Sequence, residues 1–167
     1  MTVVGIISDT HGRLDARAYA AMAEADFIIH AGDIGDLGIL HELESLAPVA
    51  AVLGNNDFDE YGSRVGRYAY PVVDGVRFLV SHYPQSVRIG FNGCAGLAAG
   101  DPLPHVCVHG HTHIPRLDVG KDARPADYVI CPGSASRPRG DNPRSIAYVL
   151  IEDGRVSGVT IEGLDGA

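Results

Sequence analysis

The sequence of 167 residues predicts one α/β domain, spanning 1–167 and built around a parallel sheet. Short β-branched runs at 3–7, 27–29 and 49–53 are continuous and apolar, which is typical of strands covered on both faces. The segment 14–25 is rich in Ala, Leu and Met and favours a helix, and 37–46 predicts a second one. This order predicts a β-α-β-α-β opening with parallel strands.

The half of the chain after residue 68 favours hairpins. The runs 68–73 and 76–81 flank Asp74-Gly75, which is a strong two-residue hairpin signal, and 145–151 and 155–161 turn at Asp153-Gly154. Further strands are predicted at 106–108 and 128–131, and a weak helix, interrupted by glycines, at 85–99. We therefore expect a second, mixed sheet that packs on the first.

Composition and charge exclude several classes of protein. A formal charge of −8 disfavours a protein that binds duplex nucleic acid, because such binding relies on Lys and Arg. No apolar run approaches the roughly 20 residues of a membrane span, and no basic segment precedes the apolar N-terminal stretch, so we expect a cytoplasmic protein without membrane contact. The three cysteines, Cys94, Cys107 and Cys131, lack CxxC spacing and are expected to be buried thiols in a reducing compartment.

Side chains that bind metals well follow five of the predicted strands. Ligand sites in open α/β sheets gather outside the carboxyl ends of the strands, so we expect these side chains to converge. They are two carboxylates, one amide and four imidazoles: Asp9, His11, Asp33, Asn55, His82, His111 and His113. Seven donors exceed the needs of one ion, and nitrogen and oxygen donors without thiolates suit Mn, Fe, Co, Ni or Zn. The pattern predicts two divalent ions with a net positive charge, which favours a phosphate ester as substrate.

These residues occur in five ordered blocks: Asp9-Thr10-His11, Gly32-Asp33, Gly54-Asn55 with Asp57, His82, and Gly110-His111-Thr112-His113. In this order they resemble the signature blocks of the calcineurin-like metallophosphoesterase superfamily. The short chain, and Ile114-Pro115 after the last block, resemble its compact YfcE-type phosphodiesterase branch. The resemblance covers residues 8–139 and implies a four-layer α/β/β/α sandwich that hydrolyses small phosphodiesters through a hydroxide bridging two metals.

The same resemblance implies how the ligands are shared between two ions. The first metal would be held by Asp9, His11, Asp33 and His113. The second would be held by Asp33, Asn55, His82 and His111, with Asp33 bridging. We expect manganese, with Fe, Ni, Co, Zn or Mg as alternatives.

The sequence departs from the family pattern at three places. Many relatives have a histidine that assists the leaving group where this chain has Asn56, and an amide cannot donate a proton as an acid. We therefore expect a preference for aryl or nucleotide esters. His82-Tyr83-Pro84 replaces a common His-Gly-His, and Cys131 replaces an asparagine before Pro132-Gly133-Ser134. Asn56 and Asp57 are the candidate catalytic residues, and Asp57 is also a candidate to orient a ligand histidine.

Several alternatives stay open. Taken singly, Asp9 could cap a helix and Asn55 could be a turn residue, but the ordered set favours a metal site. A non-catalytic scaffold of the same fold, like the retromer subunit whose metal site is eroded, is the rival function. The sequence also leaves open the substrate, diester against monoester preference, and a homodimer. Arg13, Arg137 and Arg139 could contact phosphate or solvent alone, and His30 and His109 could orient ligands or pack.

Overall fold

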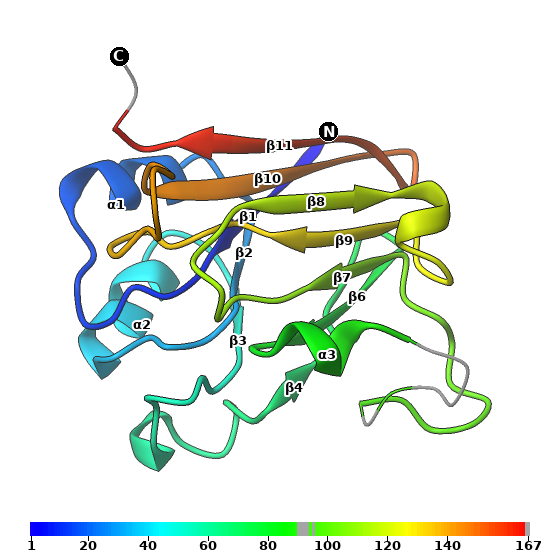
Figure 1. Ribbon diagram of the computed structural model, residues 1–167, viewed down its shortest axis with the longest axis horizontal. Coiled ribbons are helices and arrows are strands. Elements are labelled where there is room, and N and C mark those ends of the chain that lie inside the picture. The colour runs from blue at the N-terminus through cyan, green and yellow to red at the C-terminus, as the bar shows by residue number, and fades with distance from the viewer. Residues whose placement is uncertain (90–93, 95, 166–167) are drawn as a thin grey trace.

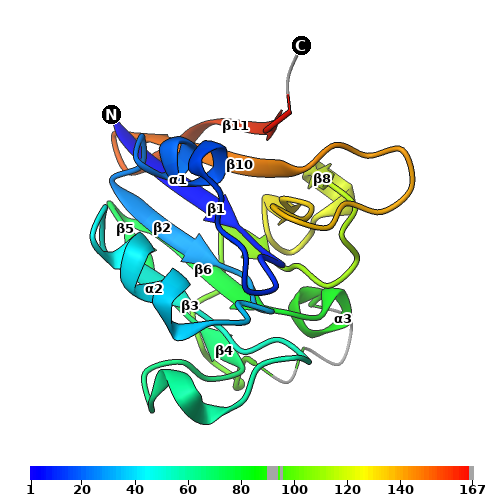
Figure 2. The same ribbon diagram turned by 90° about the vertical axis from the view of Figure 1, so that its left-hand side faces the viewer.

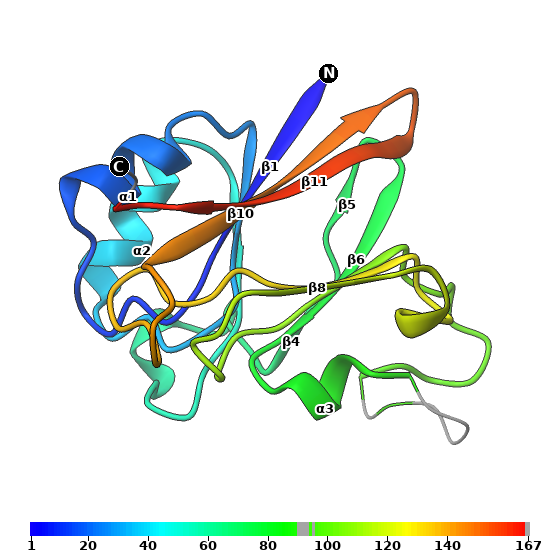
Figure 3. The ribbon, with the colours of Figure 1, turned by 45° about the horizontal axis from the view of Figure 1, so that its top comes forward.

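The computed structural model describes residues 1–89, 94 and 96–165, and in this part of the chain the strands form two mixed sheets that face each other (Figures 1 and 3). The first sheet contains, in spatial order, β11 (Arg155–Gly163), β10 (Ser145–Glu152), β1 (Thr2–Ile7), β2 (Phe27–His30) and β3 (Val49–Ala51). The second contains β4 (Tyr68–Ala69), β6 (Val76–Ser81), β7 (Val106–Val108), β9 (Tyr128–Cys131) and β8 (Arg116–Val119), with β5 (Val72–Val73) paired to β6.

The predicted parallel opening is confirmed. β1 pairs with β2, and β2 with β3, in parallel, and the crossovers contain α1 (Ala16–Met22) and α2 (Leu37–Glu44). Each helix begins after an aspartate that accepts a hydrogen bond from the first turn: Asp15 from the amide of Ala18 at 3.0 Å, and Asp36 from the amide of Gly38 at 2.7 Å. Both helices lie on the outer side of the first sheet (Figure 2).

The α/β fold of two sheets flanked by helices is confirmed, but the outer layer on the second sheet is thin. In the described residues this layer holds α3 (Pro84–Val87), the 3-10 turn η2 (Gly120–Asp122) and irregular segments, while the turn η1 (Asp59–Tyr61) follows β3. Within the described part of 85–99, the predicted helix is limited to one turn, α3; residues 90–93 and 95 of that prediction lie outside the described residues. No helix in the described part of the chain is long and apolar enough to cross a bilayer.

The second half of the chain differs from the prediction in three places. The last hairpin joins the first sheet, where β10 pairs antiparallel with β1, because β10 is buried along most of its length and fills the free edge of β1. The run 68–73 is divided into β4 and β5 at Pro71, which has no amide hydrogen for the ladder. β8 was not predicted, since this edge strand is largely exposed and carries charged residues.

Two apolar layers enclose the first sheet and explain its continuous apolar strands. Between the sheets, β1, β2, β6, β7 and β9 contribute fully buried side chains: Ile6, Ile29, Val80, Val108 and Ile130. Between the first sheet and its helices a second cluster includes Ile7, Met22, Ile28, Leu40 and Leu43. Burial on both faces leaves the loops at the carboxyl ends of these strands as the place where polar side chains can meet.

The cysteines are less uniformly buried than the sequence indicates. Cys107 and Cys131 are buried, whereas Cys94 is partly exposed. Burial raises the pKa of the Cys107 thiol to about 12 and also raises the pKa of Cys131. We predict that a disulfide reagent at about pH 8 rapidly modifies no thiol other than Cys94 in the native protein, and all of them after unfolding. Rapid labelling of three thiols in the native protein would contradict the buried positions.

Candidate metal centre

The seven predicted ligands lie in loops at the carboxyl ends of five strands from both sheets. Asp9 and His11 follow β1, Asp33 follows β2, Asn55 follows β3, His82 follows β6, and His111 and His113 follow β7. Backbone hydrogen bonds hold neighbouring loops together: the amide of Asp9 donates to the carbonyl of Gly32, and that of Gly110 to the carbonyl of His82, each at 3.0 Å. The structure therefore brings all seven residues to one end of the sandwich.

An unusual backbone conformation recurs among these residues. Five of the seven have a positive φ: Asp9 at 53°, His11 at 48°, Asp33 at 55°, His111 at 72° and His113 at 62°. Residues with a side chain seldom occupy this region, and each instance costs about 1–3 kcal/mol unless the surroundings enforce it. Strain of this kind clusters at functional sites, so its concentration here is independent support for a site.

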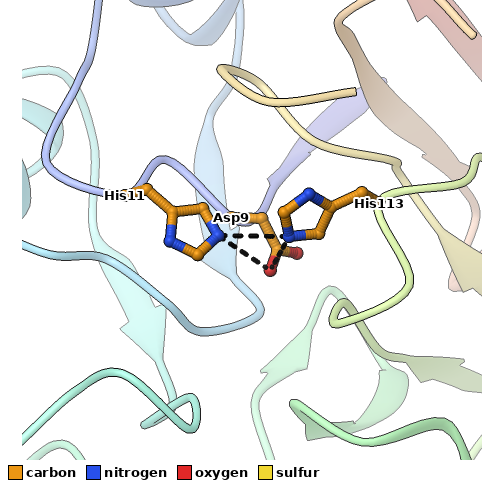
Figure 4. A group of neighbouring side chains, drawn as sticks. All are labelled: Asp9, His11 and His113. Atoms are coloured by element: carbon orange, nitrogen blue, oxygen red, sulfur yellow. Dashed lines mark hydrogen bonds and ion pairs between the residues drawn. The ribbon is translucent and has the colours of Figure 1, made fainter. Parts of the chain in front are cut away.

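The first group of ligands consists of Asp9, His11 and His113 (Figure 4). The Nε2 atoms of the two histidines lie 3.1 Å apart, and they lie 3.7 Å and 3.2 Å from Oδ1 of Asp9. His113 donates through Nδ1 to the carbonyl oxygen of Arg137 at 2.5 Å, so the lone pair of its Nε2 faces the group. Two imidazole nitrogens and one carboxylate oxygen thus face one another across a small space.

Oδ1 of Asp9 is the clearest sign that something binds in this space. Its partner oxygen Oδ2 accepts hydrogen bonds from Ser8 Oγ at 2.6 Å and from the amide of His111 at 3.1 Å. Oδ1 is buried and has no hydrogen-bond partner among the described residues. Burial by itself raises the pKa of Asp9, but the facing imidazoles of His11 and His113 and the hydrogen bond from Ser8 outweigh it and lower the pKa. An ionised, buried oxygen without a donor is costly, so a divalent cation fits here.

The second group surrounds Asp33. Its Oδ2 lies 3.5 Å from Nε2 of His82 and 3.6 Å from Nε2 of His11, so this carboxylate lies between the two groups. His82 donates through Nδ1 to the carbonyl of Ala31 at 2.7 Å, which directs the lone pair of Nε2 inward. Oδ1 of Asn55 lies 3.0 Å from Nε2 of His82 and 3.2 Å from Nδ1 of His111.

Asn56 is engaged with the central carboxylate. Its backbone amide donates to Oδ1 of Asp33 at 2.8 Å, and its side-chain Nδ2 donates to Oδ2 at 2.9 Å. Because both donors of Asn56 hold Asp33, this residue fixes the orientation of a predicted bridging ligand. Its predicted role at the leaving group concerns a substrate contact, and that role stays a prediction.

Asp57 holds the loop after β2 against the loop after β3. Its carboxylate accepts hydrogen bonds from the amides of Ile34, Gly35 and Gly54 at 2.9–3.1 Å, and from the hydroxyl of Tyr61 at 3.0 Å. In the described part of the chain none of its hydrogen bonds goes to a histidine. The structure thus gives Asp57 a positioning role through the backbone, and not the predicted one through a ligand imidazole.

Other hydrogen bonds fix the ligand loops in ways that the sequence pattern did not indicate. Ser134 and Ser136 both donate to the carbonyl of Asp9, at 2.8 Å and 3.0 Å, so the Pro132-Gly133-Ser134 turn lies beside the site. His30 accepts from the amide of Gly32 at 3.1 Å and lies 3.0 Å from Thr10 Oγ1. Burial lowers the pKa of His30 to about 4, so this imidazole is neutral and supports the loop.

The remaining candidates lie at the edge of the site or outside it. His109 is buried, and its Nδ1 lies 2.9 Å from the carbonyl of Gly110, in keeping with packing. Arg137 reaches His113 only through its carbonyl among the hydrogen bonds of the described residues, and its side chain is exposed, as are those of Arg13 and Arg139. Their roles toward a substrate stay open.

Comparison with known proteins identifies relatives along nearly the whole chain. A family model described as "Calcineurin-like phosphoesterase superfamily domain" matches residues 1–154. A relative from Methanothermobacter thermautotrophicus, named "Probable metallophosphoesterase", is 33% identical over 162 residues, covering 90% of this chain and 86% of that protein.

Two solved structures show the same fold. The phosphoesterase Yfce from E. coli superposes with a TM-score of 0.64 at 21% identity, over 95% of this chain and 98% of that one. Vacuolar Protein Sorting 29 from Cryptosporidium parvum superposes with a TM-score of 0.67 at 18% identity, over 96% of each chain.

A closely packed glycine allows a test of the site in which none of the seven ligand residues is substituted. A Cβ at Gly54 would overlap the Asp33 carboxylate, whereas a Cβ at Gly66 would have no neighbour within 4 Å. We predict that Gly54→Ala displaces Asp33 and lowers the affinity for divalent ions about 10–100-fold, and that Gly66→Ala does not. Calorimetric titration with Mn²⁺ measures both, with thermal unfolding as the check on folding. Equal affinity in the two variants would contradict the assigned position of Asp33.

Proposed function

Because the chain belongs to the calcineurin-like phosphoesterase superfamily, it is a metal-dependent phosphoesterase, and we propose that it is a dinuclear phosphodiesterase acting on small phosphodiesters. The observation that carries this proposal is the buried Oδ1 of Asp9, which has no hydrogen-bond partner among the described residues and faces imidazole nitrogens at 3.2–3.9 Å. A divalent cation would satisfy this oxygen, and imidazole with carboxylate suits Mn, Fe, Co, Ni or Zn, of which we propose manganese.

Two ions are supported by the way the ligands divide. One group joins Asp9 with His11 and His113, and the other joins Asp9 and Asp33 with His82. Asp33 lies almost equally far from His11 and His82, as a bridging ligand must. Two bound cations would supply an activated water and positive charge to balance the phosphate.

The residues of the chain itself hold and orient these groups. His82 and His113 keep their inward lone pairs because the opposite ring nitrogen of each donates to a backbone carbonyl. Asn56 holds Asp33 and cannot protonate a leaving group, so departure depends on the acidity of the leaving alcohol. This chemistry favours aryl and nucleotide esters as substrates.

A non-catalytic scaffold is the alternative, since Vacuolar Protein Sorting 29 has the same fold. Five ligands with a positive φ favour the enzyme, because a scaffold has no need of strain at this place.

One prediction from the proposed function concerns the Asp33 carboxylate. The protein should hydrolyse bis(p-nitrophenyl) phosphate with added Mn²⁺ and lose this activity with a chelator. Asp33→Asn should lower kcat/KM at least about 100-fold, because it weakens both ion sites, whereas Asp59→Asn, in the exposed part of η1, should not. Near-normal turnover by Asp33→Asn, or turnover in chelator, would refute the mechanism.

The second prediction concerns the leaving group. Methyl p-nitrophenyl phosphate should be a far better substrate than dimethyl phosphate, and Asn56→His should narrow the ratio of their kcat/KM values by about tenfold or more. Release of nitrophenol and of methanol measures the two rates. Comparable rates on both esters by the unaltered protein would show that a proton donor is present after all.

A further inference from the structure

A pocket of about 280 Å³ opens directly beside the second group of ligands. It is lined by residues that follow β3, by residues at and just before the start of β4, and by residues between β6 and α3, among them Asn55, Asp57, Arg67, Tyr68 and Tyr83. We propose that this pocket binds a compact anionic group on the organic part of the substrate, and that Arg67 is the residue that selects it. The inference rests on the proposed function and names its substrate class.

The backbone fixes Arg67 between two ligand loops. On one side, the carbonyl of Gly66 accepts a hydrogen bond from the amide of Leu53 at 2.8 Å, two residues before Asn55. On the other side, Tyr68 pairs with Ser81, which directly precedes His82. Arg67 is therefore held within reach of whatever is bound beside the second group of ligands.

Arg67 is available for an anion. Its side chain is exposed, and among the described residues it forms no ion pair, whereas Arg64 nearby is paired with Glu44. Asp57 also lines the pocket, but both of its oxygens already accept hydrogen bonds from backbone amides and Tyr61. In a chain with a formal charge of −8, a guanidinium with no ion pair to the described residues favours a carboxylate or a phosphate group at this place.

The volume of the pocket and the side chains that line it further restrict the class of substrate. Ligand pockets for drug-sized molecules measure about 300–1,000 Å³, so this one suits a smaller group. The ring of Tyr83 lies 4.9 Å from that of His111 and 5.4 Å from that of His82, and Tyr68 adds a second aromatic side chain to the lining. A short polyol or sugar unit bearing a carboxylate or a phosphate fits these features better than a dinucleotide.

Matched esters test this inference. Three p-nitrophenyl phosphodiesters differ only at the end of the second alcohol: 2-carboxyethyl, 2-phosphonoethyl and the neutral 2-carbamoylethyl ester. The Mn²⁺-loaded protein should favour at least one anionic ester over the neutral one by about tenfold in kcat/KM, mainly through a lower KM. Which anion is preferred distinguishes a carboxylate from a phosphate.

Variants assign the preference to Arg67. Arg67→Gln should bring the anionic-to-neutral ratio close to one, Arg67→Lys should keep part of the preference, and Arg64→Gln should leave it intact. Thermal unfolding checks that each variant is folded. Hydrolysis of all three esters without a preference, or a preference that survives in Arg67→Gln, overturns the inference and leaves the proposed function standing. Hydrolysis of none of them with metal overturns the proposed function itself.

Discussion

Negative charge that is buried where the two sheets meet is the constraint on which the site depends. Asp9 and Asp33 are almost fully buried, and their carboxylates face imidazole nitrogens. In the described part of the chain, hydrogen bonds satisfy Oδ2 of Asp9 but none reaches Oδ1. Without a cation this arrangement would be costly, and with one the same arrangement becomes a set of preorganised ligands. The strained backbone at five ligands is consistent with selection for that arrangement over local stability.

Strand direction, closely packed glycines and hydrogen bonds to the backbone together bring the ligand loops into this arrangement. The parallel strands have apolar side chains on both faces, and the polar loops that follow them all lie at one end of the sandwich. Glycines there let loops approach more closely than any side chain would permit, as at Gly54 against Asp33 and at Gly110 against Ser8 and Asp9. Asp57 and Ser134 then hold the loops through backbone groups and leave the inward-facing atoms of the ligands free.

The fold and the convergence of the ligands could largely be predicted from the sequence. The features that could not be predicted depend on packing and on loop conformation. Ligands at strand ends recur in order, so their convergence follows from strand direction alone. Which of the two sheets β10 joins could not be predicted, because an apolar strand can pair with the free edge of either sheet. The contact of Asn56 with Asp33, and the place of Arg67 beside Asn55, depend on loop conformations that the local residue pattern does not specify.

The central claim is that two cations bind between these side chains. Anomalous diffraction from a crystal of the Mn²⁺-loaded protein tests it most directly. The account predicts two peaks about 3.5–4 Å apart, on either side of the Asp33 carboxylate, with one of them beside Oδ1 of Asp9. A single peak, or peaks outside this set of residues, would contradict it.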